Sequence, residues 1–135
     1  MSEYEETGLW KKSLGKINDN SDKYYTYYES LRIEYRKFRE HAAQLANEIA
    51  RDLPDFTIHD ASHFDKLWKL ADLIAGNDFE LNPIEAFVLG GSFLIHDLGL
   101  GLAAYPEGID QLRKEPNWSD TIASILKEEI RSYSE

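Results

Sequence analysis

The chain has 135 residues, no cysteine, and a formal net charge of -10 that comes from 25 acidic and 15 basic residues. This length suits a single domain with its own hydrophobic core. The absence of cysteine excludes disulfides and thiolate metal sites, so a metal would have to bind to His, Asp or Glu. The acidic balance disfavours a nucleic-acid duplex or an anionic membrane as a partner.

The first segment, residues 1–22, is polar and acidic, with scattered Gly, Asn and Ser. It predicts a flexible N-terminal arm ahead of a helical domain over residues 23–135. The apolar residues of the arm are its candidate docking points: Leu9, Trp10, Leu14 and Ile17.

No secretory signal is recognisable at the N-terminus. The longest apolar run is broken by Gly90, Gly91 and Ser92 before it reaches a membrane-spanning length. The sequence therefore predicts a cytoplasmic protein that does not enter a membrane.

From Tyr24 to Ile49 apolar residues recur at alternating intervals of four and three, which predicts a long helix that ends before Pro54. This stripe is a candidate homodimer surface, but its bulky tyrosines favour packing within the chain. A second helix is predicted to begin near His59 or Asp60 and to end at Gly76. Its predicted buried stripe consists of Leu67, Leu70, Ala71 and Ile74.

A third helix is predicted by Asn82 as the N-cap, Pro83 in the first turn and Glu85 at the third position. It continues through AFVLGGSFLIHD and is apolar on nearly every side, as in the buried centre of a bundle. A last helix is predicted to begin at residues 117–119. No strand-like alternation is visible, so the predicted class is all-α.

Three of the four histidines lie in two short segments, IHDASHFDKL and FLIHDLG. Taken alone, His59 and His63 could be ordinary residues at the start of a helix. Taken alone, His96 and Asp97 could be a buried polar pair whose hydrogen bonds are satisfied within the protein. Together, two imidazoles and a carboxylate suit Mn, Mg, Fe, Co, Ni or Zn. Helical bundles commonly build metal sites from side chains on facing helices.

These motifs resemble the HD-domain metal-dependent phosphohydrolase superfamily, in which a histidine, a later His-Asp pair and a distant aspartate hold metal. The resemblance implies an HD-like helical bundle with His63, His96 and Asp97 as metal ligands and Asp97 as a catalytic residue. The implied reaction is hydrolysis of a small phosphate ester, such as a nucleotide. His59 occupies the place of the histidine that protonates the leaving group in cyclic-nucleotide phosphodiesterases.

The wider run from FTIHDASHFDKLWKLADLIAG to AFVLGGSFLIHDLGLGLAAYPEG is similar to HD domains that precede Hsp90-like ATPase regions in large prokaryotic proteins. An attached or associated ATPase of that type is therefore an expected partner. Two alternative functions remain open: a nucleotide-sensing module that regulates the ATPase without catalysis, and a di-iron oxygenase of the same fold.

Several roles also remain open at this point. Lys66 is the second candidate for the general acid. Asp60 could fix a histidine tautomer or cap the helix. After Asp97 the only aspartates that could supply the distant ligand are Asp110 and Asp120, and stabilisation of a helix N-terminus explains Asp120 adequately without a metal. The chain is therefore either the front part of a longer protein or a member with an incomplete metal shell.

Overall fold

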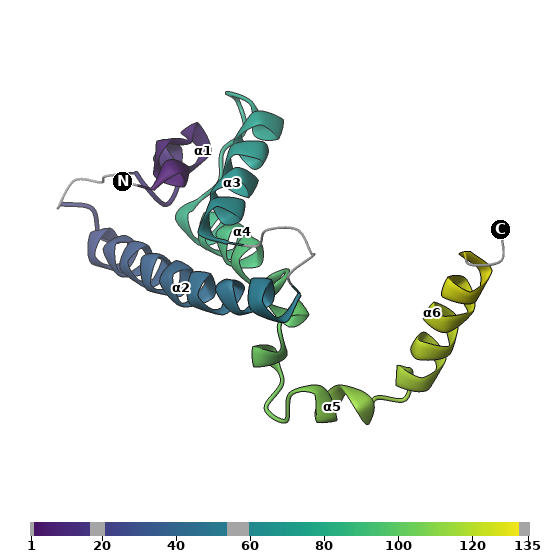
Figure 1. The fold of residues 1–135 in the computed structure, drawn as a ribbon. Coiled ribbons are helices and arrows are strands. Elements are labelled where there is room, and N and C mark those ends of the chain that lie inside the picture. Colours follow the sequence, from purple (N-terminus) through teal and green to yellow (C-terminus); the bar gives the residue numbers. More distant parts are fainter. Residues whose placement is uncertain (1, 17–20, 54–59, 133–135) are drawn as a thin grey trace. The chain divides into compact units, whose positions relative to one another are not determined.

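The computed structural model describes residues 2–16, 21–53 and 60–132 (Figure 1). These residues form helices and no strand, which confirms the predicted all-α class. One helical domain over 23–135 was the expectation from the sequence, but the chain divides after Gly101 into two compact units, 1–101 and 102–135. The first unit includes the N-terminal residues, and each unit is described by itself.

The N-terminal segment differs from the flexible arm that its composition predicts. It forms the 3-10 helix η1 (Glu3–Glu6) and the short helix α1 (Gly8–Lys12). Its apolar side chains are buried in the core: Tyr4, Leu9, Trp10 and Leu14. The Tyr4 and Trp10 rings pack edge to face at 4.8 Å, and Trp10 packs in the same way against Trp68 at 5.6 Å. Ile17 lies outside the described residues.

Backbone groups also attach this segment to the rest of the unit. The carboxylate of Asp72 accepts hydrogen bonds from the backbone N–H of Gly8 at 3.0 Å and of Leu9 at 2.5 Å. These are N–H groups of the first turn of α1, which have no partner inside the helix. Aromatic burial and this cap together explain why the acidic segment is ordered.

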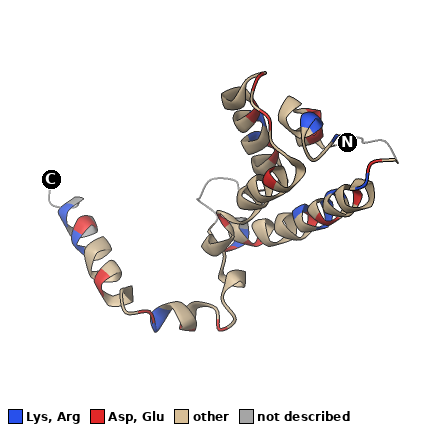
Figure 2. Ribbon diagram, turned by 180° about the vertical axis from the view of Figure 1, so that it is seen from behind, with Lys and Arg blue, Asp and Glu red and all other residues tan. Residues whose placement is uncertain are grey.

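Helix α2 (Tyr25–Asp52) is the predicted long helix. It carries charged residues of both signs along its length (Figure 2). Its inward face buries Tyr35, Ala42, Ala46 and Ile49. Two members of the predicted stripe are nevertheless substantially exposed, Tyr24 at 52% and Leu45 at 44%.

Helix α3 (Ala61–Ala75) ends at Gly76, whose φ of 66° lies in the region that favours glycine. The predicted buried stripe of α3 is wrong at Leu70 and Ile74, which are 52% and 77% exposed. Leu67 and Ala71 are half-buried, and the buried residues of the helix are Phe64, Asp65 and Trp68. The stripe residues contribute to an apolar cavity of about 400 Å³, which is lined by Leu9, Leu67, Leu70, Ala71, Ile74, Ala75, Phe79, Leu89 and Phe93.

Helix α4 (Pro83–Ile95) begins with the predicted capping box, in which Asn82 accepts from the N–H of Glu85 and the Glu85 carboxylate accepts from the N–H of Asn82. The predicted burial on nearly every side is wrong. One face is buried, at Ala86, Gly90, Gly91 and Leu94, because α2 and α3 pack on that face. The opposite face leaves Val88 65% exposed.

The segment Pro83–Leu100 has the length and composition of a possible membrane-spanning helix, with a mean hydropathy of 1.2 over 18 residues. The helix α4 within it has 13 residues, fewer than the roughly 20 that cross a bilayer. Core helices of soluble proteins reach the same length and hydropathy, so this segment is only weak evidence that the chain crosses a membrane.

The chain leaves the first unit through the 3-10 helix η2 (Leu98–Leu100). The second unit contains the 3-10 helix η3 (Leu102–Ala104), α5 (Ile109–Arg113) and α6 (Trp118–Ser132). Helix α6 begins where the sequence predicts. Three apolar residues of α6 are between 37% and 52% exposed: Ile122, Ile125 and Leu126.

Candidate metal centre

The first residue of the candidate centre, His63, lies in the first turn of α3 and is oriented by the cap of that helix. The Asp60 carboxylate accepts hydrogen bonds from the backbone N–H of Ser62 at 2.8 Å and of His63 at 3.2 Å. A hydrogen bond from the Ser62 hydroxyl is the main reason that the pKa of Asp60 is lowered. Of the two roles left open for Asp60, the structure therefore shows the helix cap.

The other two residues lie where α4 ends. His96 is the C-cap of α4, and Asp97 follows it at the entry to η2. The capping box therefore defines the start of α4, and the turn at His96 and Asp97, which leads into η2, defines its end. In between, α4 packs closely on its neighbours at Gly90, where a Cβ atom would lie 2.6 Å from both Trp68 and Tyr35.

The structure brings His63, His96 and Asp97 together from α3 and from the end of α4. His63 Nε2 lies 3.3 Å from His96 Nε2 and 3.3 Å from Asp97 Oδ2. His96 Nε2 lies 2.7 Å from Asp97 Oδ2. Among the described residues, these three form the group of His, Asp and Glu side chains that could hold a metal ion. One atom from each residue therefore faces a common point.

A hydrogen bond to the backbone orients the His96 ring as in many metal-binding histidines. Its Nδ1 lies 2.9 Å from the backbone carbonyl of Phe93. A carbonyl only accepts hydrogen bonds, so Nδ1 must carry the proton. The Nε2 atom, on the other side of the ring, then faces His63 Nε2 at 3.3 Å and Asp97 Oδ2 at 2.7 Å. Metal-binding histidines are typically held in this way, by a hydrogen bond from the ring nitrogen that does not bind the metal.

The spacing of the three atoms also fits a metal. Nitrogen and oxygen ligands lie about 2.0–2.2 Å from a tetrahedral zinc ion, so the ligand atoms around such an ion are about 3.3–3.6 Å apart. The two separations of 3.3 Å that involve His63 match this spacing, and the 2.7 Å between His96 Nε2 and Asp97 Oδ2 is shorter. The donor set of two imidazole nitrogens and one carboxylate oxygen suits a divalent transition metal.

The centre is partly open to solvent. The side chains of His63, His96 and Asp97 are 25%, 39% and 20% exposed. The apolar cavity beside α3 and α4 does not include any of these three residues in its lining. Because the cluster is partly exposed, water or a small anion can reach it.

The remaining candidates are distributed differently. His59 lies outside the described residues. Lys66 is exposed on α3, one turn beyond His63. Asp110 and Asp120 belong to the second unit, where Asp110 pairs with Arg113 at 3.3 Å and Asp120 lies in the first turn of α6.

The Phe93 carbonyl is a functional group that sequence reasoning did not identify. Every residue has a backbone carbonyl, so no residue type marks the one that accepts from His96. The available signal was position alone, because the carbonyls in the last turn of a helix are free to accept from a side chain.

Comparison with known proteins identifies the family. The HD-CE family model matches residues 53–135, which is more than half of the chain and includes His63, His96 and Asp97. No curated protein and no solved structure matches the chain. An HD-type domain accounts for the order of the histidine and the His-Asp pair and for their meeting in one cluster. The chain belongs to the HD-CE family.

Proposed function

We propose that this chain contains the metal-binding part of an HD-type hydrolase of phosphate esters, with a nucleotide as the expected class of substrate. The observation that carries the proposal is the convergence of His63 Nε2, His96 Nε2 and Asp97 Oδ2 within 3.3 Å of one another. These residues would hold one divalent ion. Mn, Mg, Fe, Co, Ni and Zn all remain candidates, and the nitrogen-rich donor set favours the transition metals among them.

A divalent ion at this position would lower the pKa of a bound water and offset negative charge on a phosphoryl oxygen. The residues of the chain supply the framework for that chemistry. The Phe93 carbonyl accepts from His96 Nδ1 and so orients Nε2 toward the other two ligands. Asp97 supplies the negative charge of the ligand set, and the Asp60 cap holds the turn of α3 that carries His63.

Protonation of the leaving oxygen needs a separate acid. His59 remains the proposed acid, on the basis of its position four residues before His63. Lys66 is the alternative acid, because it is exposed on α3, the helix that carries His63, and lies one turn beyond His63. Replacing each in turn distinguishes them: loss of the acid should slow hydrolysis of an ester with a poor leaving group far more than that of a nitrophenyl ester.

The direct test is metal binding followed by turnover. Metal-free protein is titrated with Mn²⁺, Co²⁺ and Zn²⁺ by calorimetry, then assayed on bis(p-nitrophenyl) phosphate and on a panel of nucleotides. His96→Ala and Asp97→Asn should each weaken binding at least about tenfold and abolish turnover. His41→Ala is the matched control, because His41 is an exposed histidine on α2 outside the cluster.

Equal metal affinity in the wild type, His96→Ala and Asp97→Asn would refute the proposed centre. Metal binding with no turnover, together with a nucleotide that raises the melting temperature, would instead support the sensing module that regulates an attached Hsp90-like ATPase. Iron in the purified protein with oxygen consumption would support the oxygenase alternative.

A further inference from the structure

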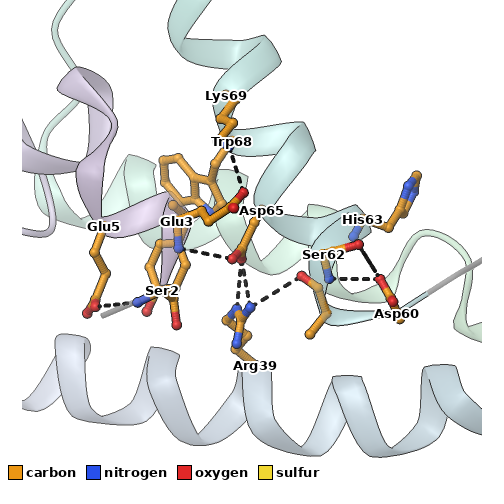
Figure 3. A network of polar contacts seen from close by, with 12 residues as sticks. Ser2, Glu3, Glu5, Arg39, Asp60, Ser62, His63, Asp65, Trp68 and Lys69 are labelled. Atoms are coloured by element: carbon orange, nitrogen blue, oxygen red, sulfur yellow. Dashed lines mark hydrogen bonds and ion pairs between the residues drawn. The ribbon is translucent and has the colours of Figure 1, made fainter.

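A polar network links α2 to the part of α3 that carries His63 (Figure 3). Arg39 donates to Asp65 Oδ1 through Nε at 3.0 Å and through Nη2 at 2.7 Å. The same Nη2 lies 3.2 Å from the backbone carbonyl of Ala61, to which it also donates. The other oxygen of Asp65 accepts from the backbone N–H of Glu3 at 3.2 Å. One guanidinium thus contacts α3 at two points.

These two points lie on either side of His63 in the sequence. Ala61 is the first residue of α3, and Asp65 is two residues beyond His63. Residues two apart on a helix project about 200° apart around its axis, so Asp65 and His63 occupy opposite faces. Figure 3 shows the His63 side chain directed away from the Arg39–Asp65 contact. Arg39 therefore contacts the face of the first turns of α3 that is opposite to the face carrying the His63 imidazole.

The network is shielded from solvent, which makes its geometry stiff. The Arg39 and Asp65 side chains are 17% and 7% exposed. A side-chain atom lies about 5–6 Å from the axis of its helix, so a rotation of about 10° moves it by about 1 Å. Displacements of that size are enough to degrade a metal site. A change that lets the first turn of α3 rotate would therefore separate His63 from His96 and Asp97.

We propose that Arg39 is a positioning residue for the metal centre, which acts through Asp65 and the Ala61 carbonyl to hold His63 Nε2 in register with the other two ligands. This inference rests on the proposed metal site. The role requires the fork shape of the guanidinium, because one group must reach a carboxylate and a carbonyl together. Lysine would keep the charge but present one nitrogen in place of the fork.

A matched control lies one turn away on the same helix. Arg36 donates to Glu5 Oε1 through Nε at 3.0 Å and through Nη2 at 2.9 Å. Its contact has the same donors and the same type of acceptor, but Glu5 belongs to η1 and not to α3. Arg36→Lys therefore makes the same chemical change as Arg39→Lys without touching the helix that carries His63.

The experiment measures the Co²⁺ dissociation constant by calorimetry, and the visible absorption of bound Co²⁺, which reports ligand geometry, for the wild type and both variants. Titrations are run at least 15 °C below the melting temperature of each metal-free protein, so that global unfolding does not contribute. Arg39→Lys should weaken Co²⁺ binding about 10- to 100-fold and change the absorption spectrum. Arg36→Lys should leave the constant within about twofold and the spectrum unchanged.

Two outcomes separate this inference from the proposed function. A wild type that binds no Co²⁺, Mn²⁺ or Zn²⁺ would overturn both. A wild type that binds metal while Arg39→Lys binds it equally well, with the same spectrum, would overturn the positioning role and leave the metal centre standing. If Arg39→Lys does not fold, Asp65→Asn replaces it, since it keeps the side-chain shape and one oxygen acceptor, and the same loss of affinity is expected.

Discussion

Gly90 lies at the closest approach between α4 and its neighbours, which makes Gly90→Ala a sharp test of the fold. A Cβ atom at Gly90 would lie 2.6 Å from Trp68 Cζ2 and 2.6 Å from Tyr35 Cε2. Both rings are about 99% buried, so neither can move aside without disturbing the core. Next to it, a Cβ at Gly91 would lie 3.5 Å from Phe38, an ordinary van der Waals contact.

The pair of variants isolates the cost of that contact. Alanine in place of glycine stabilises a helix interior by about 0.5–1 kcal/mol, and this gain applies to both positions. Overpacking a core costs about 1–3 kcal/mol, and this cost applies to Gly90 alone. We therefore expect Gly91→Ala to be neutral or stabilising, and Gly90→Ala to be less stable than Gly91→Ala by about 1–3 kcal/mol.

Urea unfolding followed by circular dichroism measures both free energies, and thermal unfolding should separate the two variants by several degrees, at about 4 °C per kcal/mol. Equal stability of Gly90→Ala and Gly91→Ala would refute the packing of α4 against Trp68 and Tyr35. It would also remove the physical basis for the position of His96 and Asp97 at the end of α4.

Three further variants test other parts of the first unit. Asp60→Ala should lower the free energy of unfolding by about 1 kcal/mol because α3 loses its cap, whereas Asp60→Asn should cost little; equal losses in urea unfolding would contradict the cap. Tyr35→Phe should cost about 1–3 kcal/mol because the buried Trp68 Nε1–H, now 2.7 Å from the Tyr35 hydroxyl, loses its acceptor; the exposed Tyr27→Phe is the control and should be neutral. Burial raises the pKa of Tyr4 from 10.0 to about 12, so the protonated ring stabilises the fold fully below pH 10, and this contribution is lost as the pH rises from 10 to 12. Unfolding as a function of pH should therefore show a steeper alkaline loss for the wild type than for Tyr4→Phe, and parallel curves would count against the burial of Tyr4.

The sequence alone predicted the local features of this protein. Three of these features depend only on residues that are near one another in the sequence. They are the start of α4 at Asn82 and Pro83, the end of α3 at Gly76 and the periodicity of the long helix α2. Caps and helix periodicity depend on neighbours three or four positions away, and such neighbours can be identified without knowing the fold. His63, His96 and Asp97 were also predicted as one candidate site, from the order of their motifs and the resemblance to HD domains, and the structure brings the three together.

Only the tertiary structure decided which faces of the helices are buried. Leu70 and Ile74 have the spacing of a core stripe, yet the buried positions of α3 are Phe64, Asp65 and Trp68. An amphipathic pattern shows that a face is apolar, but the face that is covered depends on partners distant in the sequence.

The ordering of the N-terminal segment and the position of Arg39 are long-range effects of the same kind. Tyr4 and Trp10 are buried because they meet Trp68, and Asp65 can be buried because it meets Arg39 from another helix. A charged residue in a core requires a charged or hydrogen-bonding partner, and nothing in the local sequence of Asp65 indicates which residue that partner is. The sequence therefore determined the helices and the candidate ligands, and the packing of those helices determined where the candidate ligands lie relative to one another.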